Sequence, residues 1–268
     1  LDPPHIHRFE CTLPLKLHEK NPRDHVQHML LPHETFSKMY HMYPNQWKTR
    51  MVPTDESINM FWSKMEGHPL LVDHPMKERD NWWELAVPYS IHIDGVPCVG
   101  VGKAWGKTME LFSWCSCLVL GSSMATFLYI YGLFGVCISK RFGADTMLKF
   151  WTVLCWSMAQ LFSGEWDNKD AFGVLYDPDS PEGRRAGKPL CGRGLKKCFG
   201  VPLLARGDLD MFFKTMGLQN YNSNTPCNLC PANTSNMPWK DLRRTALWLT
   251  RTWTPQTWKA RNLFPQCL

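Results

Sequence analysis

The stretch VPYSIHID, residues 87–94, is the starting point for interpreting the rest of the chain. Polar and apolar side chains alternate through Ile91 and Ile93, which is the period of a half-buried β-strand. Asp94-Gly95 follows as a turn signal. We therefore predict a strand over residues 87–94 that ends at Asp94.

A long uncharged segment comes next. Residues 111–139 contain no charged side chain over 29 positions, which is long enough for a membrane-spanning helix. The centre of the segment, residues 121–123, is Gly-Ser-Ser, and it separates two runs rich in β-branched and aromatic residues. We predict two antiparallel strands in the sheet interior, over residues 109–120 and 125–134, that turn at this centre. The membrane helix is the alternative.

The remaining pattern completes an α/β fold. Residues 144–162 carry an apolar helical face, residues 199–205 form a short apolar strand, and residues 210–216 form a second helix. Residues 163–197 are rich in Gly, Pro and charge, and are expected to be loop. The predicted order is β-β-β-α-β-α, a mixed sheet with flanking helices.

The first third of the chain looks different. Seven prolines interrupt residues 1–53, a capped amphipathic helix is predicted over residues 54–66, and residues 68–83 look like a linker. We therefore expect two regions: a mostly helical or irregular N-terminal region at 1–83, and an α/β domain at 84–268.

Composition narrows the class of protein. The chain has 268 residues, of which 44% are hydrophobic and 13% aromatic, and this excludes a disordered tail. Eleven cysteines, an odd number, favour a reducing compartment, the nucleus or the cytosol. Residues 1–30 are polar and show no signal peptide. Because the sequence begins with Leu1 and ends abruptly at Leu268, we expect a fragment of a longer protein.

Positive charge is concentrated near the C-terminus. Residues 184–268 carry fourteen Lys and Arg against three Asp and Glu, and tryptophans are interleaved with the second half of these charges. Lys and Arg neutralise phosphates and indole rings stack on bases, so we predict contact with nucleic acid. The alternative is a solvated basic face over a tryptophan core. The candidate residues are Arg184, Arg185, Lys188, Arg193, Lys196, Lys197, Arg243, Arg244 and Arg251.

Acids follow two of the predicted strands. Asp94 ends the first strand and Asp208 follows the last, with Asp210 as an alternate. Carboxylates on neighbouring strand ends can share Mg²⁺ or Mn²⁺, which assists phosphodiester chemistry. The structural alternative is a turn at Asp94 and a helix cap at Asp208. No small-molecule substrate is evident.

The pair Cys227-x-x-Cys230 has half the spacing of a zinc site. A tetrahedral site needs two more ligands, for which Cys191, Cys198 and Cys267 are the candidates within the sequence. We predict that the pair binds zinc, that Cys191 and Cys198 stay apart from it, and that the missing ligands lie downstream. The alternative is two unpaired thiols in a turn.

The order of these motifs resembles the transposases of CACTA-type cut-and-paste elements and transposon-derived relatives, over about residues 85–260. The resemblance implies a ribonuclease H-like fold, DNA as the partner, and Asp94 and Asp208 as the metal-binding acids. Asp208 is preferred to Asp210 because it lies nine residues before Gly217. The motifs are Ile93-Asp94-Gly95-Val96, Ser113-Trp114, the segment from Gly207-Asp208 to Gly217, and Cys227-x-x-Cys230.

Two departures from this family bear on activity. No Asp or Glu follows Asp241, so the third acid of the family has no counterpart, and the histidines that complete its cysteine knuckle are missing. The chain is therefore expected to be truncated or decayed, and the resemblance implies the fold more strongly than a working nuclease. A non-catalytic nucleic-acid-binding or interaction module is the main alternative. We expect a nuclear protein, with the cytosol as alternative, and leave a homo-oligomer open.

Overall fold

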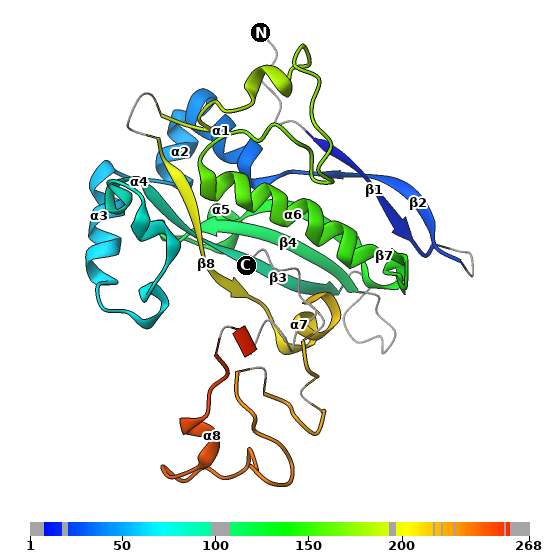
Figure 1. Cartoon of the computed structure of the whole chain (residues 1–268). Coiled ribbons are helices and arrows are strands. Elements are labelled where there is room, and N and C mark those ends of the chain that lie inside the picture. Colours follow the sequence, from blue (N-terminus) through cyan, green and yellow to red (C-terminus); the bar gives the residue numbers. More distant parts are fainter. Residues whose placement is uncertain are drawn as a thin grey trace. The chain divides into compact units, whose positions relative to one another are not determined.

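A four-stranded mixed sheet lies at the centre of the first part of the chain, in the order β5-β4-β3-β8 (Figure 1). β3 (Ala86–Pro97) pairs antiparallel with β4 (Thr108–Ser116), which pairs antiparallel with β5 (Leu128–Phe134). β8 (Phe199–Arg206) lies parallel to β3 on its other side. The predicted α/β class, a mixed sheet with flanking helices, is confirmed.

The computed structural model describes residues 8–17, 21–97, 108–192, 197–216, 218–220, 222–227, 229–254 and 256–257. The chain divides into two compact units. The first contains the chain up to Arg206, and the second is Gly207–Gln266. Residues 1–83 belong to the same unit as the sheet, whereas the sequence had suggested a boundary after residue 83.

The uncharged segment forms antiparallel strands, as predicted, with three corrections. β4 ends at Ser116 rather than at residue 120, and a helical turn, α5 (Ser123–Thr126), precedes β5. β5 has a single neighbour among the described strands and is therefore an edge strand, not an interior one. None of the described helices combines the length and the hydrophobicity that spanning a bilayer would need.

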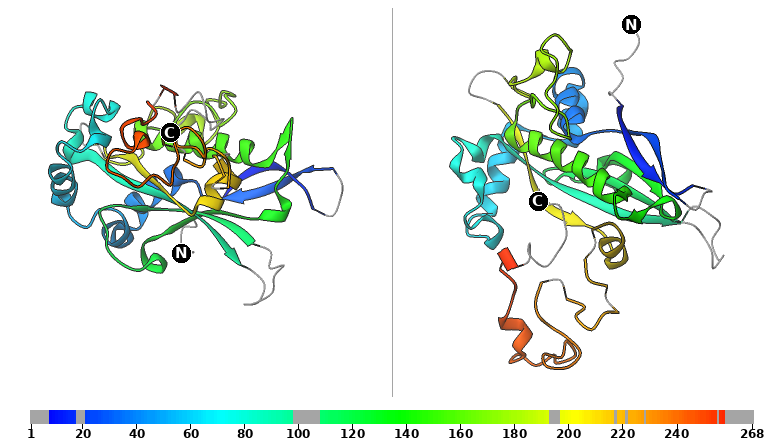
Figure 2. Two further views of the ribbon diagram at one scale, coloured as in Figure 1. Left: turned by 90° about the horizontal axis from the view of Figure 1, so that it is seen from below. Right: turned by 45° about the vertical axis from the view of Figure 1, so that its right-hand side comes forward.

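The long helix α6 (Thr146–Ser163) packs against the sheet (Figures 1 and 2). Its Phe150 ring lies 4.4 Å from that of Phe112 on β4, and Trp151 meets the same ring edge-on at 5.9 Å. All three side chains are fully buried, so they form much of the core. The Asp145 carboxylate accepts a hydrogen bond from the first turn and caps the helix.

The other end of α6 is closed by Gly164, which has a left-handed φ of 75°. A Cβ at this position would lie 3.1 Å from Cβ of Phe199, so glycine also allows β8 to approach closely. Arg79 secures the same end of the helix. Its guanidinium lies 3.7 Å from the Phe199 ring centroid and donates to the carbonyl of Ser163 at 2.9 Å.

The N-terminal region contains a hairpin that the sequence did not predict. β1 (Phe9–Leu15) and β2 (Arg23–Met29) pair antiparallel, and Leu30 N donates to Ile130 O of β5 at 2.9 Å. Figure 2 shows this hairpin from two further directions. The helices that follow are α1 (Pro32–Met42), α2 (Pro44–Arg50), α3 (Asp55–Lys64) and α4 (Trp82–Leu85), with 3₁₀ turns at Pro69–Leu71 and Pro75–Glu78.

These helices pack directly on the sheet unit. α1 lies against α6, and α3 contacts β3 through Trp62, whose Nε1 donates to Ala86 O at 2.8 Å. The capped helix predicted over residues 54–66 is confirmed, and Thr54 and Ser57 form a capping box. These contacts explain why the N-terminal region is not a separate unit.

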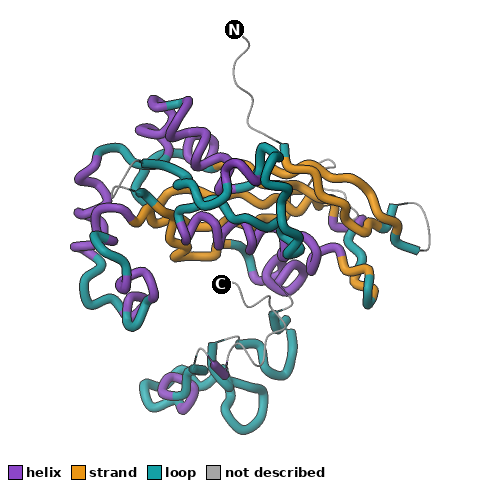
Figure 3. The backbone as a smooth tube through the Cα atoms, turned by 45° about the horizontal axis from the view of Figure 1, so that its top comes forward, coloured by secondary structure: helices purple, strands orange, loops and turns teal. Residues whose placement is uncertain are grey.

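The smaller elements complete the description. A 3₁₀ turn (Gly135–Cys137) leads to the two-residue strands β6 (Lys140–Arg141) and β7 (Ala144–Asp145). The expected loop after α6 contains a 3₁₀ turn at Gly183–Arg185. In the second unit the helices are α7 (Leu209–Met216) and α8 (Leu247–Thr250), and Figure 3 shows that its remaining described residues are mostly loop.

Candidate functional site

Asp94 lies inside β3, not at its end. It pairs with Leu111 of β4, so the turn predicted at Asp94-Gly95 is a continuous strand. Pairing with β8 stops earlier, where His92 lies opposite Arg206. Asp94 is therefore in the segment of β3 that extends beyond β8, and its side chain is exposed.

Asp208 caps the helix α7. Its Oδ1 accepts a hydrogen bond from the backbone N of Met211 at 2.6 Å, and the residue is exposed. The alternate acid, Asp210, forms an ion pair with Nζ of Lys214 at 2.5 Å on the same helix. Because this lysine compensates the charge of Asp210, Asp208 remains the better candidate of the two for a metal ligand.

Cys227 and Cys230 lie in a loop of the second unit. Cys227 Sγ accepts a hydrogen bond from Leu229 N at 3.4 Å, as expected for a sulfur in a tight turn. Burial raises the pKa of Cys230, and a hydrogen bond with the Cys227 side chain raises it further. The two thiols are thus neighbours, which suits two ligands of one zinc ion.

Cys191 and Cys198 form a separate pair in the first unit. Cys191 Sγ donates to the carbonyl of Cys198 at 3.2 Å. A hydrogen bond from the Cys191 side chain lowers the pKa of Cys198, whereas burial raises that of Cys191 well above its ordinary value. Among the residues that the structure describes, no three His, Cys, Asp or Glu side chains gather into a metal-binding cluster. The chain therefore offers two cysteine pairs and no complete four-ligand zinc site in its described part.

The described part of the first basic tract is largely engaged within the protein. Arg184 donates to the carbonyl of Asp179, and Lys197 forms an ion pair with Glu165 at 2.9 Å. Lys188 is exposed. Arg185 is bound by the carboxylates of Glu34 and Glu182. Arg193 and Lys196 lie outside the described residues.

The second basic tract is more open. Arg243 makes a bidentate ion pair with Asp241, with N–O distances of 2.8 and 2.9 Å. Arg244 and Arg251 are exposed. The indole Nε1 of Trp248 donates to the Asp241 carbonyl at 2.8 Å and the ring is half-buried, so this tryptophan packs beneath the chain rather than facing solvent.

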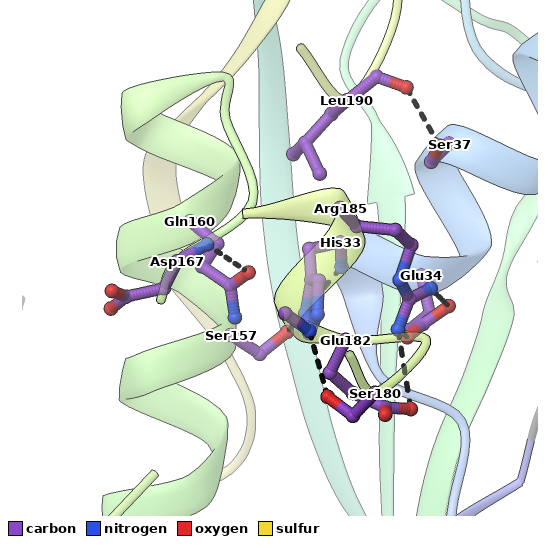
Figure 4. A network of polar contacts seen from close by, with 11 residues as sticks. His33, Glu34, Ser37, Ser157, Gln160, Asp167, Ser180, Glu182, Arg185 and Leu190 are labelled. Carbon is purple, nitrogen blue, oxygen red and sulfur yellow. Dashed lines mark hydrogen bonds and ion pairs between the residues drawn. The ribbon is translucent and has the colours of Figure 1, made fainter. Parts of the chain in front are cut away.

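A buried polar network that sequence reasoning missed joins α1, α6 and the loop after α6 (Figure 4). His33 is 1% exposed, and its Nδ1 lies 2.8 Å from Ser157 Oγ on α6. Glu34, 5% exposed, forms an ion pair with Arg185 at 3.2 Å, and Arg185 also reaches Glu182 at 3.8 Å. These contacts hold together α1, α6 and the loop after α6, which are distant in sequence.

Two basic side chains of this network differ in charge: His33 is neutral and Arg185 is charged. Burial, and then the neighbouring charge of Arg185, lower the pKa of His33 to about 3, so this imidazole is neutral at physiological pH. The guanidinium of Arg185 lies 4.0 Å from the centroid of the Trp166 ring, and Trp166 in turn meets His33 edge-on at 5.3 Å. Arg185 is therefore engaged in contacts within the protein, through two carboxylates and an indole ring.

Beside this network lies a cavity of about 490 Å³, which is within the range of small-ligand sites. It is lined by aromatic rings and carboxylates from the hairpin, α1, α6 and the loop after α6. The only signals in the sequence were Pro32-His33-Glu34 at a helix start and the acids of residues 167–182. These residues are far apart in the chain, so only the fold brings them together.

The chain matches no protein-family model, and it has no significant match among curated proteins or among solved structures.

Proposed function

We propose that this chain is a transposase-derived DNA-binding protein with a ribonuclease H-like fold, related to enzymes of metal-dependent DNA strand transfer. The register of β3 and β8 is the observation that supports this best. The strands are parallel neighbours, with His92 opposite Arg206. Asp94 comes two residues after His92, and Asp208 comes two residues after Arg206 along the chain. Each acid thus comes two residues after a member of the His92–Arg206 pair, and the two strands run in the same direction at this pair.

The two acids suit a divalent metal by their chemistry. Both are exposed, and carboxylate oxygens are the ligands that Mg²⁺ and Mn²⁺ prefer. A bound ion would supply charge stabilisation to a phosphodiester undergoing substitution. Asp94 and Asp208 would hold it, with Asp208 also fixed by its cap bond to α7. The sequence holds no acid after Asp241, so we propose weak or absent nuclease activity in this chain by itself.

DNA is the proposed partner because several Lys and Arg side chains are exposed and are not used in the internal ion pairs described above. Lys188, Arg206, Arg244 and Arg251 are exposed. Lys and Arg at a surface neutralise phosphates and release counterions, so the affinity should depend strongly on salt. Because DNA is the proposed partner, we also propose a nuclear location. Separately, we propose Cys227 and Cys230 as half of a structural zinc site.

A non-catalytic DNA-binding module is the second candidate. The missing acid after Asp241 and the capping role of Asp208 both favour it, since a capping aspartate needs no metal to explain its position. In this case the basic residues would bind DNA, and the acids would be structural.

Metal binding separates the two candidates. We expect Mn²⁺ to bind the full chain in isothermal titration calorimetry, and Asp94→Asn and Asp208→Asn each to weaken it at least about tenfold. Asp73→Asn is the matched control, because Asp73 is exposed and asparagine tolerates its left-handed φ of 55°. Equal Mn²⁺ binding by all four proteins would exclude the strand-transfer site and leave the binding module.

DNA binding tests both candidates together. The slope of log affinity against log salt should fall by about 1 for each of Arg244→Ala and Arg251→Ala, as expected for lost phosphate contacts. Lys77→Ala removes an exposed lysine outside the basic tracts and should leave the slope unchanged. No measurable binding to duplex DNA at 50 mM salt would refute the proposed function.

A further inference from the structure

We infer that the cavity between the hairpin, α6 and the loop after α6 binds the cationic side chain of a partner peptide, lysine or arginine. This site is independent of the DNA-binding surface proposed above. Its aromatic walls, its excess of carboxylates and one unsatisfied buried donor carry the inference.

The aromatic walls suit an organic cation. Phe9, Trp156, Phe172 and Tyr176 line the cavity, and the rings of Phe9 and Trp156 lie 5.8 Å apart at 42°. Phe172 is 53% exposed, so it lies at the rim rather than in the core. Ammonium and guanidinium groups are attracted to the faces of such rings, with the largest effect where water is excluded.

The charge of the lining points to the same ligand. Five carboxylates line the cavity against two guanidinium groups, those of Arg8 and Arg185. Arg185 is already bound by Glu34 and Glu182, and His33 is neutral. A net negative lining repels phosphates and favours a cation.

Two of the three remaining carboxylates, Asp167 and Asp170, are held in place by the backbone. Asp170 Oδ1 accepts hydrogen bonds from the N atoms of Phe172 and Val174, at 2.8 and 2.9 Å, and Asp167 Oδ1 accepts from two backbone N atoms in the same way. The negative charge of these carboxylates also affects the pKa of the Tyr176 hydroxyl. Burial and the nearby charges of Asp170, Glu182 and Asp167 raise its pKa to about 12, although Arg185 opposes this.

A buried donor on a cavity-lining residue offers a hydrogen bond to an oxygen of the ligand. Gln160 lines the cavity and is 3% exposed; its Oε1 accepts from Asp167 N at 3.0 Å, as Figure 4 shows. Its Nε2 has no hydrogen-bond partner among the described residues. A buried N–H without a partner is costly, and a peptide carbonyl next to the cationic side chain would satisfy it. This favours an amino-acid residue of a peptide over a free amine.

The inference is tested by calorimetry with short capped peptides and the full chain. We expect peptides with a central lysine, trimethyllysine or arginine to bind, and the neutral isosteres acetyl-lysine and citrulline to bind at least about tenfold more weakly. Spermidine and guanosine serve as competitors. Spermidine binding as tight as the peptides would overturn a peptide ligand, and displacement by guanosine would indicate a nucleobase pocket instead.

Substitutions in the cavity lining test whether the peptide binds in this cavity. Phe172→Ala and Asp170→Asn should each weaken peptide binding about 3- to 30-fold, and the asparagine keeps the oxygen that accepts the two backbone bonds. Phe142→Ala and Glu66→Gln remove an exposed ring and an exposed acid elsewhere and should have no effect. Equal weakening by test and control variants, or no binding of any cationic peptide, would overturn the inference.

Discussion

The buried histidine of α1 should make the first unit lose stability as the pH falls. In the folded protein, burial and Arg185 lower the pKa of His33 to about 3, whereas an unfolded chain protonates histidine near pH 6.5. Between these values the unfolded state binds the extra proton, so the free energy of unfolding decreases as pH falls below about 6.5. Stability from this group is fully present above pH 6.5.

The magnitude follows from these two pKa values. Each pH unit between them changes the free energy by about 1.4 kcal/mol, so going from pH 7 to pH 5 should cost about 2 kcal/mol through His33 alone. His33→Asn retains a polar group that can reach Ser157 and removes the titration. The wild-type protein should therefore lose about 2 kcal/mol more than this variant over the same pH interval.

The assay is urea unfolding of both proteins at pH 7 and pH 5, monitored by tryptophan fluorescence. His28→Asn, an exposed histidine on the hairpin, is the matched control and should keep the wild-type pH dependence. If His33→Asn does not fold, His33→Gln replaces it. A difference between wild type and variant below about 0.5 kcal/mol would refute a neutral, buried His33 as the cause.

Three further outcomes follow from single contacts. Arg185→Met should destabilise the protein by about 3 kcal/mol in urea unfolding, because it leaves Glu34 buried without its partner, and the additional change Glu34→Gln should recover part of this loss. Asp145→Ala should cost about 1 kcal/mol, since it removes the cap of α6; an unchanged unfolding midpoint would contradict the capping role. Cys198 should react with iodoacetamide faster than Cys191 at pH 7.5, because its lowered pKa gives more thiolate, and mass spectrometry of the labelled peptides measures the ratio.

Much of the sheet could be predicted because its signals are local. The helix expected at residues 144–162 occurs at Thr146–Ser163, and the strand expected at residues 199–205 occurs at Phe199–Arg206. The helix has an apolar face and capping residues at both ends, Asp145 and Gly164, and the strand is a short apolar run. The strand predicted at residues 87–94 is longer in the structure, Ala86–Pro97. Asp94-Gly95 is typical of a turn, but here pairing with β4 continues through both residues.

The N-terminal hairpin could not be predicted in the same way. Its second strand, RDHVQHM, is polar, and Pro14 interrupts the apolar run of the first. These strands are stabilised by contacts distant in sequence: Leu13 is fully buried, and Lys16 N donates to Cys137 O at 2.9 Å. Strand propensity depends on the neighbours that the fold provides, and a single sequence does not show them.

The same limit explains why the basic tracts looked more uniform in the sequence than they are in the fold. Glu34 is 151 residues from Arg185, and Glu165 is 32 residues from Lys197, so neither ion pair is visible as a local pattern. A guanidinium that already binds two carboxylates and lies over an indole ring would have to break these contacts to bind a phosphate. If the chain binds DNA as we propose, its affinity should therefore depend more on the exposed arginines of the second tract than on the first tract, although the charges per residue are similar.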